Sequence, residues 1–190
     1  QLGDFNVFEQ RKNDGARLVI MMDTSGSMAS YEEPDRRYGE VSGATLAWET
    51  AAALRARYPQ SELFTFHSDE QQTVIQPIPD GYRLQRQGGG NNDCAMLLWL
   101  RDYLGADTSN STLVLISDGF PVQAHSRCNP IRHTQQIANE MYEDGLNYIS
   151  VLVRQSYNDL YPASTVATVN TLGDYENLIE AFDALDAQGY

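Results

Sequence analysis

The sequence predicts an α/β fold in which a doubly wound, mainly parallel β-sheet is covered by helices on both faces. Short and almost continuous apolar runs, such as 18–22 and 113–116, are typical of strands buried on both sides of a parallel sheet. Longer segments between these runs carry apolar residues at helical spacing. A length of 190 residues suits a single domain with one hydrophobic core.

Each element follows from its apolar residues and from the breakers around it. The run 18–22 predicts the first strand, and apolar residues at helical spacing predict a helix over 38–58, which Pro59 ends. Alternation predicts a strand at 61–67 and a short antiparallel edge strand at 72–76, which Pro77 ends. The later strands are expected at 111–117, 148–153 and 165–171, and the later helices at 94–104, 130–144 and 175–187.

The domain is expected to occupy residues 17–190, because residues 1–16 are polar and irregular and read as a lead-in. No apolar stretch approaches the ~20 residues that span a bilayer, so no membrane partner is expected. A formal net charge of −13 argues against nucleic acid as a partner, since its binding requires basic side chains that neutralise phosphates.

The spacing of the two cysteines, Cys94 and Cys128, does not tell whether they come close enough for a disulfide, so free thiols are the default expectation. A cytoplasmic location is the favoured expectation. The spacing of the cysteines and histidines does not match that of a zinc site.

Oxygen-bearing side chains follow the apolar strands at the carboxyl edge of the predicted sheet. Asp23, Ser25 and Ser27 come directly after the first strand, and Asp118 follows the strand at 111–117. The glycine-rich turn that precedes the helix at 94–104 adds three more candidate ligands, which are Asn91, Asn92 and Asp93. Ligation by oxygen alone suits Mg²⁺, which is usually held by one or two protein carboxylates and keeps several waters. The pattern therefore predicts a Mg²⁺ site, at which Mn²⁺ or Ca²⁺ would be substitutes.

The order Asp-x-Ser-x-Ser, glycine-rich turn and Ser-Asp-Gly resembles the metal-ion-dependent adhesion site, or MIDAS, of von Willebrand factor A domains. In that family, the residue at the place of Asp118 acts on the metal through water. Most members also have a metal-reaching threonine in the second loop, where this chain has Asn91, Asn92 and Asp93.

The segments 91–99 and 115–122 further resemble the C-terminal domain of the cobaltochelatase subunit CobT family, which also lacks that threonine. This resemblance implies a non-catalytic domain that presents Mg²⁺ to an acidic residue of an AAA+ ATPase subunit or a large chelatase subunit. Its partner-binding residues would be Tyr31, Glu32, Gly119 and Phe120. The alternative is a generic adhesion or interaction module of the same fold, unrelated to chelatases.

An enzyme of the haloacid-dehalogenase type is a remote alternative, because its nucleophilic aspartate also follows a first strand. In those phosphatases a second acidic residue lies two positions later, where this chain has Ser25. Lys12 is the only lysine and precedes the first strand, so no lysine in a later loop can hold a phosphoryl group. We therefore expect no catalytic residues in this domain.

Overall fold

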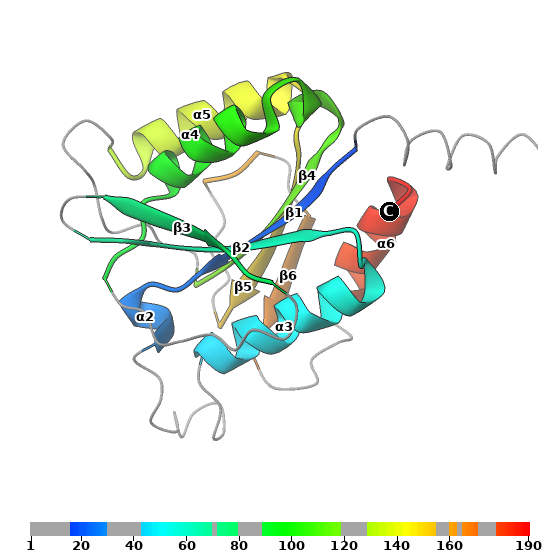
Figure 1. The fold of residues 1–190 in the computed structure, drawn as a ribbon, viewed down its shortest axis with the longest axis horizontal. Coiled ribbons are helices and arrows are strands. Elements are labelled where there is room, and N and C mark those ends of the chain that lie inside the picture. The colour runs from blue at the N-terminus through cyan, green and yellow to red at the C-terminus, as the bar shows by residue number, and fades with distance from the viewer. Residues whose placement is uncertain are drawn as a thin grey trace, which may run out of the picture.

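A computed structural model of the chain describes residues 16–29, 43–69, 72–79, 89–118, 129–154, 160–162, 165–170 and 178–190. Figure 1 shows a twisted sheet with helices on both of its faces, which confirms the predicted fold class. The strands are β1 Leu18–Asp23, β2 Glu62–Ser68, β3 Thr73–Pro77, β4 Thr112–Ser117, β5 Asn147–Val153 and β6 Thr165–Val169.

The six strands lie in the order β3-β2-β1-β4-β5-β6. All neighbours pair in parallel except β2 and β3, so the antiparallel edge strand is confirmed. After β1 the chain builds β2 and β3 on one side of it and then crosses to β4 on the other side. The sheet therefore has a topological switch point between β1 and β4, where α/β proteins commonly bind ligands beyond the carboxyl ends of the strands.

All four predicted helices are present, and the expected starts at 38 and 175 lie outside the described residues. They are α3 Gly43–Arg57, α4 Asp93–Leu104, α5 Arg132–Glu143 and α6 Ile179–Ala187. Two short helices, α2 Gly26–Ala29 and η2 Gly105–Asn110, were not predicted. The α5 helix begins later than expected because the Asn129 side chain accepts hydrogen bonds from the backbone N–H groups of Ile131 and Arg132.

The sheet separates two apolar layers, and the strand period of two assigns each residue to one of them. In β1, Leu18, Ile20 and Met22 pack toward the layer of α3 and α6, whereas Val19 and Met21 pack toward the layer of α4 and α5. Figure 1 shows these helix pairs on opposite faces. The same alternation turns the residues that end β1 and β4, Asp23 and Ser117, toward the α4 side.

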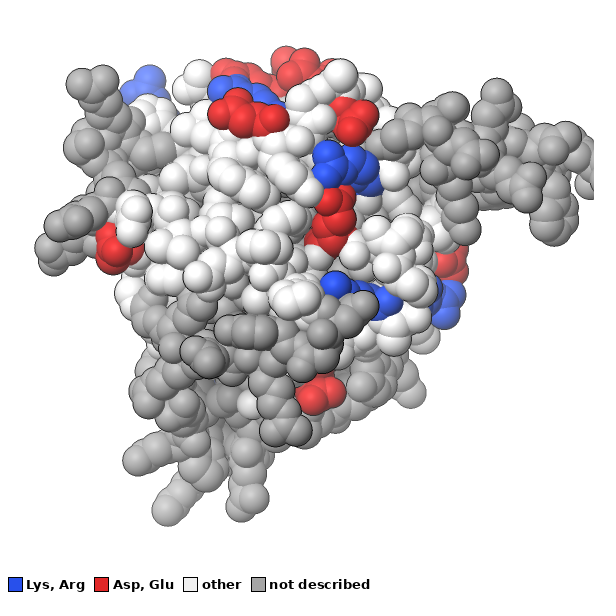
Figure 2. All heavy atoms as spheres, in the orientation of Figure 1, with Lys and Arg blue, Asp and Glu red and all other residues white. Residues whose placement is uncertain are grey.

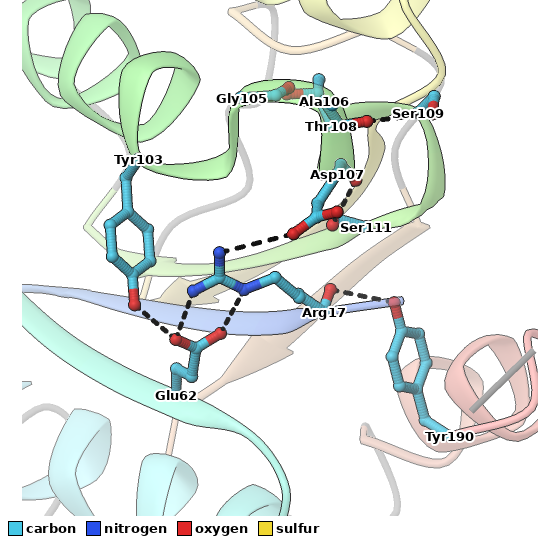
Figure 3. Close-up of polar contacts among 10 residues, drawn as sticks. All are labelled: Arg17, Glu62, Tyr103, Gly105, Ala106, Asp107, Thr108, Ser109, Ser111 and Tyr190. Atoms are coloured by element: carbon cyan, nitrogen blue, oxygen red, sulfur yellow. Dashed lines mark hydrogen bonds and ion pairs between the residues drawn. The ribbon is translucent and has the colours of Figure 1, made fainter. Parts of the chain in front are cut away.

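At the amino-terminal edge of the sheet, Arg17 is the centre of a polar network (Figure 3). Its guanidinium donates two hydrogen bonds to Glu62, at 2.9 and 2.6 Å, and lies 4.4 Å from the ring centre of Tyr103. Tyr103 also donates to Glu62, and Tyr190 donates to the Arg17 carbonyl at 3.0 Å. This network ties β1, β2, α4 and the C-terminal residue together on the edge away from the predicted metal site.

Glu62→Gln is expected to lower the free energy of unfolding by about 1–3 kcal/mol at pH 7, because it weakens two charge-assisted hydrogen bonds. Burial alone would raise the pKa of Glu62, but the hydrogen bonds from Arg17 and Tyr103 lower it overall. A lowered carboxyl pKa adds stability above the unfolded-state value and loses it as the pH falls through the folded-state value. Urea unfolding should therefore show a larger difference between wild type and variant at pH 7 than at pH 3.

On the face shown in Figure 2, the described arginine side chains are scattered rather than gathered in a continuous basic patch, and some of them lie beside carboxylates. Arg57 contacts Asp186 at 2.6 Å, and Arg101 contacts Glu140 at 3.3 Å. Among the described residues, no helix is both long and apolar enough to cross a membrane.

Candidate metal centre

Asp23 ends β1 at the switch point and is almost fully buried, with 1% of its surface exposed. Its Oδ1 accepts a hydrogen bond from the Ser25 backbone N–H at 2.7 Å, and its Oδ2 accepts one from the Ser117 hydroxyl at 3.1 Å. Because β1 and β4 pair in parallel through Met22 and Ile116, the next residues of the two strands, Asp23 and Ser117, are neighbours. The carboxylate is thus held in one orientation by both strands that flank the switch point.

The two predicted serine ligands lie together on the turn that follows Asp23. Their hydroxyl oxygens are 3.1 Å apart, with Ser25 buried and Ser27 exposed. The Gly26 N–H donates to the Gly89 carbonyl at 2.7 Å, which joins this turn to the glycine-rich loop. The serine pair therefore lies between a buried carboxylate and solvent.

The second loop places its three polar side chains in different roles. Asn92 caps α4, because its Oδ1 accepts a hydrogen bond from the Ala95 N–H at 3.0 Å, and its Nδ2 is buried without a partner among the described residues. Asn91 Nδ2 lies 3.4 Å from Asp93 Oδ1. Tyr161, which follows β5, donates to Asp93 Oδ2 at 2.6 Å. Helix capping by Asn92 makes Asn91 and Asp93 the better candidates to replace the missing threonine.

Among the described residues, no positively charged side chain offsets the carboxylates of this site. Burial raises the pKa of Asp23 to about 8, and the negative charges of Asp118 and Asp93 add to the shift. Burial also raises the pKa of Asp93 to about 6; hydrogen bonds from Tyr161 and Asn91 oppose this shift, whereas Asp118 adds to it. Every charged group that acts on these two pKa values among the described residues is another carboxylate. A bound cation would relieve this repulsion.

The donors present suit a magnesium ion held mainly by hydroxyl and water oxygens. Within the described part of the chain, no three Asp, Glu, His or Cys side chains are grouped closely enough to hold a metal ion. Mg²⁺ does not need such a group, because it commonly keeps several waters and uses one or two carboxylates. The Ser25 and Ser27 hydroxyls beside Asp23 fit this requirement, and Asp118 and Asp93 are near enough to act electrostatically.

The structure brings most of the predicted ligands to one edge of the sheet. Three separate loops supply them, and the charges of Asp23, Asp93 and Asp118 influence one another. The predicted partner-binding residues Tyr31, Glu32, Gly119 and Phe120 lie outside the described residues, as do residues 1–15 of the predicted lead-in 1–16.

Ser117 and Tyr161 were not predicted as residues of this site, although each donates a hydrogen bond to one of its carboxylates. Ser117 could have been found from its place at the end of a strand expected beside the first. Nothing in the sequence indicated that Tyr161 belongs to the site, because the segment after β5 has no recognisable pattern.

The expectation of free thiols is wrong for Cys94, which is disulfide-bonded. Cys128 is the only other cysteine of the chain and hence the only partner that the chain itself offers; it lies outside the described residues. Cys94 is the second residue of α4 and directly follows Asp93, so the bond anchors the end of the helix that carries this carboxylate.

We expect the denatured chain to react with iodoacetamide only after reduction. Mass spectrometry should then show two alkylated cysteines with dithiothreitol and none without it. Alkylation of both cysteines in the absence of reductant would contradict the disulfide.

Searches by sequence give no relative: no family model matches the chain, and neither does any curated protein. Solved structures do match in fold. Proximal thread matrix protein 1 from the mussel byssus superposes with a TM-score of 0.58 at 14% identity, over 88% of this chain and 46% of that one. The pilus adhesin SpaC of Lactobacillus rhamnosus GG gives 0.56 at 14% identity, over 91% and 30%. The SpRpn10 VWA domain gives 0.50 at 8% identity, over 86% and 93%.

These matches show that the chain has the fold of von Willebrand factor A domains. The chain spans about half the length of the byssus protein and less than a third of the adhesin. One structure of the byssus protein has a MIDAS motif occupied by zinc.

Proposed function

We propose that this domain binds Mg²⁺ at the switch point and uses the ion to bind an acidic side chain of a partner protein. The observation that carries the proposal is the hydroxyl pair of Ser25 and Ser27 beside Asp23, a buried carboxylate that is surrounded by further negative charge. When bound, the metal would supply a positive charge with a coordination position open to an outside carboxylate.

The residues of the chain have separable tasks in this proposal. Ser25 and Ser27 would coordinate the ion directly, and Asp23 would do so directly or through a water. Asp118, together with Asn91 or Asp93, would hold metal-bound waters. Because Ser27 is the exposed member of the pair, it marks the side from which a partner carboxylate would approach.

For the partner, the resemblance to the CobT family favours an AAA+ ATPase subunit and a large chelatase subunit. In that setting a charge-assisted contact through the metal would be coupled to the conformations of the ATPase. Mn²⁺ or Ca²⁺ would be substitutes at the same site. The domain would act by binding, and no residue is assigned a catalytic role.

A generic adhesion module is the second candidate, and two observations favour it. The chain resembles in fold a byssus matrix protein and a pilus adhesin, and Cys94 is disulfide-bonded. Disulfides are common in extracellular proteins and rare in cytosolic ones.

Calorimetric titration with Mg²⁺ and Mn²⁺ tests the metal site. Wild type is expected to bind one ion, and Ser27→Ala should weaken binding at least about tenfold because it removes a ligand. Ser109→Ala is the matched control, since Ser109 is exposed in η2 and its hydroxyl contacts only a local carbonyl. Equal heats for wild type and Ser27→Ala would overturn the proposal.

Capture of partners with and without EDTA separates the two candidates. Retention of an AAA+ ring subunit only in the presence of Mg²⁺ would support the chelatase-type role. Retention of matrix or cell-surface proteins would support adhesion instead, and capture that EDTA leaves unchanged would contradict a metal-dependent contact.

A further inference from the structure

Tyr161 lies behind the candidate metal centre and donates its hydroxyl hydrogen bond to Asp93. The side chain is buried, and the distance from its oxygen to Asp93 Oδ2 is 2.6 Å. Its ring packs against Tyr148 with a centroid distance of 5.5 Å. Tyr148 also donates one hydrogen bond, but to the backbone carbonyl of Ala138 at 2.9 Å. Two neighbouring buried tyrosines therefore have the same kind of surroundings and different acceptors.

A buried carboxylate needs donors that fix its orientation and offset its lost hydration. Asp93 is 2% exposed, and its described donors are Tyr161 on one oxygen and Asn91, at a longer distance, on the other. The Tyr161 bond is the shorter one, and it comes from a segment that follows β5 and belongs to none of the three predicted loops. The orientation of the Asp93 carboxylate thus depends on a fourth segment of the chain, which contains Tyr161.

A small cavity lies beside this hydrogen bond and extends to Ser117. The cavity has a volume of about 10 Å³, and its polar lining comprises Asp93, Ser117, Ser150 and Tyr161. A space of this size with several polar groups is enough for about one water molecule. Ser117, which lines the same cavity as Tyr161, donates to Asp23 Oδ2.

We propose that Tyr161 is a positioning residue of the metal centre, which holds the Asp93 carboxylate in the orientation that replaces the missing threonine. The inference rests on the proposed metal-binding function. Tyr161 is not itself proposed as a metal ligand. It acts through its hydrogen bond to Asp93, as groups that hydrogen-bond to ligands commonly do.

Tyr161→Phe removes this one hydroxyl and keeps the ring, so it is the test variant. Its Mn²⁺ dissociation constant, measured by calorimetry, should rise about 10- to 100-fold over wild type. Tyr148→Phe is the matched control, because it removes a buried hydroxyl from the adjacent ring without touching Asp93, and its dissociation constant should change less than about twofold. The electron paramagnetic resonance spectrum of bound Mn²⁺ should change in Tyr161→Phe alone.

A double variant that combines Tyr161→Phe with Asp93→Asn shows whether Tyr161 acts through this carboxylate. In that background Tyr161→Phe should change the dissociation constant less than about twofold, since the charge on which it acts is already gone. Thermal unfolding of the metal-free variants checks that each one is folded.

The outcomes separate this inference from the proposed function. Absence of Mn²⁺ binding by wild type would overturn both. Normal binding by wild type, with Tyr161→Phe equal to Tyr148→Phe, would overturn the role of Tyr161 and leave the metal centre standing. An undiminished effect of Tyr161→Phe in the Asp93→Asn background would show that it does not act through Asp93.

Discussion

Asp23→Asn is expected to stabilise the metal-free protein at pH 8 and to abolish its stabilisation by Mg²⁺. Burial raises the pKa of Asp23 to about 8 from an ordinary value of 3.8, and the nearby carboxylates add to this shift. A carboxyl group whose pKa is raised by folding favours the folded state below the unfolded-state pKa. That contribution is lost as the pH rises through the folded-state pKa. Metal-free wild type should therefore lose stability between about pH 4 and pH 8.

Asparagine keeps the shape of the group without its charge. Its amide oxygen can still accept from the Ser25 N–H, and its amide nitrogen can donate to the Ser117 hydroxyl, so both existing contacts have a substitute. One unit of pKa shift corresponds to about 1.4 kcal/mol, so a gain of at least about 1 kcal/mol in the free energy of unfolding is expected at pH 8. Denaturant unfolding at pH 5 and pH 8, with and without Mg²⁺, measures it.

The control for this experiment is Asp102→Asn, which changes an exposed carboxylate on α4. It should leave the response to Mg²⁺ unchanged. A variant at Asp23 that is less stable than wild type at pH 8 without metal would contradict the electrostatic account of the site.

Gly89→Ala is expected to disrupt the second loop and with it the binding of Mg²⁺. Gly89 has a φ of +84°, and a Cβ atom there would lie 2.3 Å from the Ser68 carbonyl oxygen. The left-handed conformation alone costs about 1–2 kcal/mol for a residue with a side chain. The clash adds to this cost because the Cβ atom would meet backbone atoms of Ser68, which cannot rotate away as a flexible side chain could. Moving the loop would also break the contact of the Gly89 carbonyl with the Gly26 N–H, which holds the serine turn in place.

Gly105→Ala separates the effect of backbone strain from the effect of the steric clash. Gly105 also has a positive φ, +52°, but a Cβ there would meet nothing within 4 Å. It should lower the free energy of unfolding by about 1–3 kcal/mol through backbone strain alone and leave Mn²⁺ affinity unchanged. A Gly89→Ala variant with wild-type affinity for Mn²⁺ would show that this contact is not needed to form the site.

The fold was largely predictable because its strong signals are local. The apolar runs at 18–22 and 113–116 became the buried strands β1 and β4, and the parallel arrangement placed the residues after them at one edge. Helix capping by Asn92 could also have been predicted, because an asparagine just before a helix commonly accepts a hydrogen bond from a backbone N–H group of the first turn. Asn92 was instead predicted as one of three candidate ligands, from its place in the motif.

The less predictable parts depend on contacts between distant segments. Tyr161 and Asp93 are 68 positions apart in sequence, and no periodicity relates them. The same holds for the disulfide of Cys94, because spacing alone does not say whether two thiols meet. The raised pKa of Asp23 likewise arises from burial and from charges on other loops, which only the folded chain reveals.

The bond at Cys94 has a consequence for how the protein should be produced. Thiol-reducing surroundings such as those maintained by glutathione and thioredoxin would open it, whereas a secretory or periplasmic route would preserve it. Opening it would free the start of α4 beside Asp93, so the chain made in each surrounding would differ in covalent structure at the rim where partners are expected to bind. Material from a reducing host is thus a chemically different sample from the oxidised protein described above.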